Sequence, residues 1–106
     1  MTPTTIDAIP FTNLTTEQEG ALIARHVLPH PHEPGRANAY LAPGGPSVAA
    51  VIRSLRADGG KIGATASSWQ ITDEAVRAAI AYYRRHRAVI DARLLLEDDA
   101  WDAEDA

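Results

Sequence analysis

The 106-residue chain contains no cysteine, one methionine and one phenylalanine. The absence of cysteine excludes a disulfide framework, thiolate metal sites and cysteine nucleophiles. No apolar stretch approaches the roughly 20 residues that a membrane-spanning helix needs, and no basic segment followed by an apolar run opens the chain. We therefore expect a cytoplasmic protein without a membrane partner. A chain of this length builds one modest hydrophobic core.

The sequence also lacks the residue patterns of common catalytic sites. No serine, histidine and acid stand in a nucleophile context, and the segment 43–46 (Pro-Gly-Gly-Pro) lacks the lysine and the spacing of a phosphate-binding loop. His26, His30 and His32 are close enough in sequence to chelate a metal, but neighbouring prolines favour a solvated loop. A metal-dependent enzyme would rest on these three histidines alone. We expect no catalysis, no metal and no other cofactor.

Charge is distributed unevenly along the chain. The net charge is −4, which by itself disfavours a nucleic-acid partner. Residues 1–34 carry one arginine and four acids, residues 35–93 carry nine basic residues and four acids, and residues 94–106 carry six acids and no base. A basic middle between acidic ends suggests one surface for a polyanion and another for a basic or apolar protein.

The first half of the chain predicts one helix and one short strand. Residues 1–13 show little periodicity and indicate an extended arm. Thr15 or Thr16 can cap a helix with acids in its first turn and an apolar stripe that includes Val27, and this helix should end before Pro29. Residues 29–46 are rich in proline and glycine, and their apolar island at residues 39–41 is a candidate strand.

The second half predicts three helices. Ser47 should cap a helix that ends at residues 59–60, both glycine. Residues 61–70 can hold one short helix. Thr72 should cap the longest helix, in which no glycine or proline occurs before the end of the chain. Alternating spacings of four and three along that helix are typical of a coiled-coil seam, which we assign to a homodimer interface formed by Val76, Ile80, Tyr83 and Ile90.

The segment from Val48 to Arg93 resembles the bacterial family known as domain of unknown function 433. The resemblance lies in a valine-led helix that ends at Gly59, in Trp69 closing a short helix, and in the cap segment 71–76 (Ile-Thr-Asp-Glu-Ala-Val). It continues through the segment 78–83 (Ala-Ala-Ile-Ala-Tyr-Tyr) into a basic stretch. The resemblance implies a homeodomain-like, dimeric fold of the VapB-like antitoxins, which are often encoded beside a PIN-like nuclease toxin.

Helix-turn-helix geometry indicates which residues would contact DNA. The second helix of that motif enters the major groove, and the residues near its start read base edges. Base or phosphate contacts are therefore expected from Arg53, Arg56, Lys61, Gln70, Thr72, Arg77 and Arg84. Asp73 and Glu74 oppose this, because they would lie near phosphates. A solvated helix face is the alternative for the arginines.

The acidic end of the chain suggests a protein partner. Leu95, Leu96 and Trp101 are apolar anchors among carboxylates, and Glu97, Asp98 and Asp99 would face a basic surface around a toxin active site. A solvated terminus is the alternative. Tyr82, Tyr83 and Trp69 are expected in the core or in a dimer interface.

Together these observations predict a mostly α protein without enzymatic activity. We expect a homeodomain-like helix-turn-helix with a long C-terminal helix and a short extended or β segment before it, assembled as a homodimer. The expected parts are an N-terminal arm and helix (1–34), a helix-turn-helix core with the dimerising helix (35–96) and an acidic tail (97–106). The expected function is that of a DNA-binding antitoxin that neutralises a PIN-like toxin and regulates its own operon. The alternative is a protein-interaction module on a helix-turn-helix that does not bind DNA.

Overall fold

A computed structural model of the protein describes residues 14–30, 35–42 and 44–105, with side chains placed as far as Glu97. This part of the chain is mostly helical and contains one short two-stranded sheet. The predicted arm at residues 1–13 lies outside the described residues, as do His32 and the side chain of Trp101. No helix within the described ranges is long and apolar enough to cross a membrane.

Three helices begin where side chains cap them. Thr15 forms a capping box with Gln18 at the start of α1 (Thr16–His26). The Ser47 hydroxyl accepts from the Ala50 amide at the start of α2 (Val48–Ala57). The Thr72 hydroxyl accepts from the Ala75 amide, at 3.0 Å, at the start of α4 (Asp73–Arg85). The predicted caps are confirmed. They could be predicted from the sequence because each bond joins residues only three positions apart.

The predicted short helix is α3 (Ile62–Trp69). It is separated from α2 by Gly59 and Gly60, which have φ of 69° and 83° in the left-handed region that favours glycine. The buried Thr65 hydroxyl donates to Asp58 across this corner at 2.9 Å. A turn of three residues, which begins with Gln70 at φ 57°, leads from α3 to α4.

The sheet joins the end of α1 to the segment before α2. The strand β1 (Val27–Leu28) pairs antiparallel with β2 (Tyr40–Leu41), with Val27 opposite Leu41. The one-turn 3₁₀ helix η2 (Arg36–Asn38) precedes β2. The predicted strand is confirmed at Tyr40 and Leu41. Including Val27 in the helical stripe was wrong, because its backbone is extended (φ −111°, ψ 129°) and pairs with β2.

The predicted long C-terminal helix is interrupted at His86. Its backbone (φ −128°, ψ 37°) leaves the helical region, and its amide donates to the carbonyls of both Tyr82 and Tyr83. A second helix, α5 (Arg87–Asp105), follows at once and includes the predicted acidic tail. The interruption changes the direction of the chain, so that Ile90 and Leu94 are buried in the same core as α4. One continuous helix was therefore the wrong prediction.

The core lies mainly between α2 and α4, and it includes the four residues predicted as a dimer seam. Val76, Ile80, Tyr83 and Ile90 are at most 1% exposed and belong to the core of their own chain. A second copy cannot reach them in this conformation, so their assignment to a dimer interface is wrong. Spacings of four and three occur equally in a helix that is buried within one chain.

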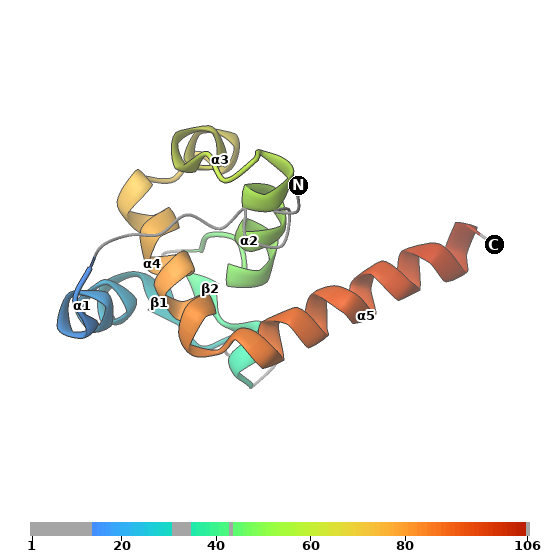
Figure 1. Ribbon diagram of the computed structural model, residues 1–106, viewed down its shortest axis with the longest axis horizontal. Helices are drawn as coiled ribbons and strands as arrows, with labels where there is room; N and C mark the ends of the chain where they lie inside the picture. The colour runs from blue at the N-terminus through green and yellow to red at the C-terminus, as the bar shows by residue number, and fades with distance from the viewer. Residues whose placement is uncertain (1–13, 31–34, 43, 106) are drawn as a thin grey trace, which may run out of the picture.

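Figure 1 shows α4 at the centre of the molecule. Helix α1 packs on one side of α4, whereas α2 and α3 pack on other sides. The first turns of α5 contact α2, α4 and η2, and the rest of the helix extends away from the body.

Candidate functional site

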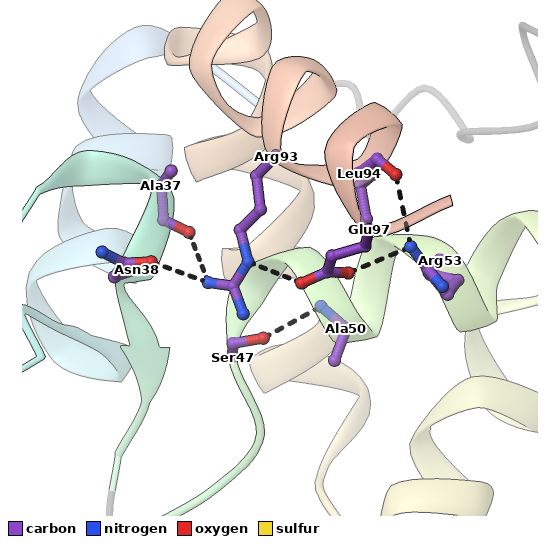
Figure 2. A network of polar contacts seen from close by, with 8 residues as sticks. All are labelled: Ala37, Asn38, Ser47, Ala50, Arg53, Arg93, Leu94 and Glu97. Atoms are coloured by element: carbon purple, nitrogen blue, oxygen red, sulfur yellow. Dashed lines mark hydrogen bonds and ion pairs between the residues drawn. The ribbon is translucent and has the colours of Figure 1, made fainter. Parts of the chain in front are cut away.

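Arg53, predicted to contact DNA, instead binds α5. Its Nη2 donates to the Glu97 carboxylate at 3.0 Å and to the Leu94 carbonyl at 3.4 Å (Figure 2). The other Glu97 oxygen accepts from Nε of Arg93 at 2.9 Å. Arg93 Nη1 donates to the Ala37 carbonyl at 2.8 Å. This network fixes α5 to both α2 and η2, and it uses the charge of Glu97, which we had expected to face a toxin.

Arg56 forms a second polar cluster with Tyr83, Arg87 and Asp91. The Tyr83 hydroxyl donates to Asp91 at 2.7 Å and accepts from Arg56 and Arg87. Both guanidinium groups lie 5.4 Å from the centre of the Tyr83 ring, within range of a cation–π interaction. Burial raises the pKa of Tyr83, and the hydrogen bond to Asp91 raises it further. Arg56 is therefore engaged inside the chain and does not project toward a phosphate.

Helix α1 is fastened to α4 at both ends by charged groups. At one end Glu74 accepts from His26 Nε2 at 2.6 Å and from Arg25 Nη1 at 2.9 Å. The hydrogen bond with His26 has the largest effect in lowering the pKa of Glu74, and the hydrogen bond with Arg25 lowers it further. At the other end Arg85 donates to the Thr16 carbonyl at 2.7 Å. Glu74, which we had expected to repel phosphates, is thus neutralised by groups at the end of α1.

The face of α4 beneath α1 is the face that carries Arg77. By helical spacing, Ala78 and Ala81 lie on this face between Glu74 and Arg85, and both alanines are fully buried. Arg77 and Glu74 line a cavity of about 390 Å³ together with side chains of α1. Helix α1 therefore packs beside Arg77, whereas Gln70 and Thr72 at the start of α4 are exposed, and contact of these residues with DNA stays a prediction.

The seven predicted DNA-contacting residues point toward different neighbours. Arg53 and Arg56 contact α5, and Arg77 lies beside α1. Thr72 serves as a cap, Gln70 occupies the turn, Lys61 is exposed before α3, and Arg84 is half-buried near the end of α4. The two arginines of α2 are thus paired with acids of α5. Local sequence patterns do not reveal the ion pairs of Arg53 and Arg56, because each arginine pairs with an acid more than 30 positions away.

A wide cleft of about 840 Å³ lies between the end of α1 and the turn from α3 to α4. Its lining includes Gln70, Ile71 and Trp69. Trp69, predicted in the core or a dimer interface, is exposed at the surface, where its indole N–H donates to Ser54 at 3.0 Å. Tyr82 and Tyr83 are buried in the core, as predicted.

His26 and His30 each contact a residue other than a histidine. His26 contacts Glu74, and the ring of His30 lies edge-on to Tyr40 with 6.0 Å between centroids. Within the residues that the structure describes, no three histidine, cysteine or acidic side chains form a metal-binding group. His26 is thus a contact between helices.

The outward side of α5 exposes apolar side chains. Leu95 is 63% exposed, Leu96 68% and Val89 41%, and the alanines at 88 and 92 are exposed beside them. Leu95 and Leu96 were predicted as partner anchors, and both are accessible to a partner. Trp101, the third predicted anchor, has its side chain outside the described residues. This surface consists of side chains that only a protein or another apolar partner would cover.

Comparison with known proteins found no matching family model, no matching curated protein and no matching solved structure.

Proposed function

We propose that the chain is a protein-binding module of the antitoxin kind, which uses α5 to bind and block a PIN-like nuclease toxin. The observation that supports this proposal is the exposure of Leu95 and Leu96 on a helix that extends beyond the body (Figure 1). Adjacent exposed leucines supply apolar area to a groove without the loss of polar hydration. The antitoxin assignment itself follows from the sequence resemblance.

Charge supports a basic partner. Residues 94–106 carry six acids and no base, and α5 runs through them to Asp105. Enzymes that cleave RNA need a positive surface for phosphates, and an acidic helix is attracted to such a surface and competes with RNA for it. Glu97 is already paired with Arg53 and Arg93, so the attraction must come from the acids beyond it.

Operator DNA is a second candidate partner. The observation in its favour is the turn of three residues that joins α3 to α4, a length common in helix-turn-helix motifs. Two observations favour the alternative, in which the helix-turn-helix does not read DNA. Arg53 and Arg56 each form an ion pair with an acid of α5, and α1 packs on α4. Under our proposal, a mobility shift with the promoter fragment of the chain's own operon gives only weak, salt-sensitive binding without sequence preference.

Growth rescue tests the antitoxin proposal directly. Cells expressing the nuclease encoded beside this gene receive either the parent chain or a chain with Leu95→Lys and Leu96→Lys. We expect the parent to restore growth and the double variant to fail, because lysines cannot enter an apolar groove that has a basic rim. A matched control, Ser67→Lys with Ser68→Lys on exposed positions of α3, should rescue like the parent. Full rescue by the leucine variant would contradict the proposal.

A further inference from the structure

The outward side of α5 is uncharged from Ala88 to Leu96, within the part of the helix whose side chains the structure describes. At 100° per residue, its exposed apolar positions fall within an arc of about 120°. We call this arc the α5 face, and it consists of Ala88, Val89, Ala92, Leu95 and Leu96. Ile90 and Leu94 lie on the opposite side of the helix and are buried in the core. Helix α5 is thus apolar on two opposite sides, and its own chain covers one of them.

We propose that the α5 face pairs antiparallel with the α5 face of a second copy of this chain, centred on Ala92. A two-fold axis at this position places the two Ala92 side chains opposite each other. Val89 then faces Leu95 of the partner subunit, and Ala88 faces Leu96 of the partner subunit. Each large side chain meets a smaller one, so the separation between the two helices stays nearly constant along the contact.

A parallel pair would not fit in this way. It would set Leu95 and Leu96 against the same leucines of the second copy, and Ala88 against the same alanine. The helices would then be held apart at one end and leave a gap at the other, which forfeits contact between side chains. The order of sizes along the α5 face therefore favours the antiparallel arrangement.

The charge along the chain favours the same orientation. Residues 98–105 at the end of α5 include five acids, whereas residues 84–87, which run from the end of α4 to the first residue of α5, are three arginines and a histidine. In an antiparallel pair, the acidic end of each helix passes the basic corner of the other copy. In a parallel pair, the two acidic ends lie side by side and repel each other within the screening length of about 8 Å at physiological salt.

This pairing does not depend on the proposed toxin partner, but it constrains that partner. Leu95 and Leu96 lie on the α5 face, so one pair of leucines cannot serve a second copy and a toxin at the same time. The self-paired chain is then a resting form, and binding of a toxin to α5 separates the two copies. The interface is small, so we expect it to be transient.

Sedimentation equilibrium of the isolated chain, at low salt and about 100 µM, tests the pairing, since small interfaces associate in this range. The test uses Val89→Lys, Leu95→Glu and the double variant, and all substituted positions are exposed, so the fold should tolerate them. We expect the mass of two chains for the parent and of one chain for each single variant. The double variant should return to two chains, because the introduced lysine and glutamate face each other across an antiparallel pair. Ser68→Lys, an exposed position on α3, is the control and should behave as the parent.

Three results would overturn the inference. They are a parent that sediments as one chain at this concentration, single variants that still sediment as two chains, and a double variant that remains one chain. Because no toxin is present in this measurement, its failure leaves the growth-rescue test of the proposed function unaffected. Loss of growth rescue, in turn, would not alter the mass of the isolated chain.

Discussion

His26 Nε2 lies 2.6 Å from Oε2 of Glu74, although the two residues are 48 positions apart in sequence. The contact joins the last residue of α1 to the first turn of α4. Arg25 donates to the same carboxylate oxygen. Helix α1 contains no fully buried residue, so these charged contacts supplement the packing of its partly buried Ile23 against the core.

The substitution Glu74→Gln should loosen α1 without unfolding the core. The amide side chain loses the charge that His26 and Arg25 share, so hydrogen exchange of the α1 amides should become faster while that of α4 stays slow. Asp73→Asn is the matched control, because it makes the same charge change one position away, outside the contact with α1. Equal exchange in the two variants would show that Glu74 does not hold α1.

Glu74 also predicts a dependence on pH. Its pKa is lowered in the folded chain from an ordinary value of 4.5. The contribution of the Glu74 carboxylate to the stability of the contact between α1 and α4 is therefore complete above pH 4.5. It is lost as the pH falls through the lower pKa of the folded chain. Exchange of the α1 amides, corrected for intrinsic rates, should rise below pH 4.5 in the parent and change less in Glu74→Gln.

His86 should make the protein less stable on mild acidification. Burial against neighbours that include the Tyr82 ring lowers its pKa from 6.5, and the charges of Arg36 and Arg85 lower it further. The unfolded chain takes up the proton first, so stability falls as the pH drops through 6.5. His86→Gln should show a smaller loss of melting temperature between about pH 7.5 and pH 5.5. His30→Gln is the comparison, and an equal effect of both substitutions would refute the assignment to His86.

Arg93→Met should weaken the attachment of α5. The side chain loses its bonds to the Ala37 carbonyl, to Asn38 and to Glu97, and it leaves Glu97 with Arg53 as its remaining partner in this network (Figure 2). We expect the free energy of unfolding, measured by urea denaturation, to fall by about 1–2 kcal/mol. Lys61→Met removes a charge from an exposed position and should change stability by much less. A loss of equal size in both variants would mean that charge alone, and not this network, is responsible.

Ile90→Ala tests whether the predicted seam is core. Ile90 is fully buried with α2 and α4, so its truncation should cost about 2–5 kcal/mol of unfolding free energy. At protein concentrations where the parent is one chain, that loss should not depend on concentration. A loss that grows with concentration would instead place Ile90 in an interface between copies.

Much of the fold could be predicted from the sequence, because its signals are local. Thr15, Ser47 and Thr72 bond to amides three residues away, and Gly59 adopts a backbone conformation that other residues rarely adopt. The exposure of Leu95 and Leu96 could also be predicted from the sequence, because an acidic segment follows them directly. Such features require no knowledge of distant parts of the chain.

The tertiary structure decided what the local signals leave open. The apolar spacing of Val76, Ile80 and Tyr83 shows which side of a helix is buried, but the same spacing serves a partner subunit and the chain's own core. The charge of Arg53 is visible in the sequence, whereas its engagement by Glu97, 44 positions away, depends on the interruption at His86 that brings α5 back to α2. Hydrophobic periodicity and charge determine which surfaces need a partner, and only the path of the chain determines which partner each surface meets.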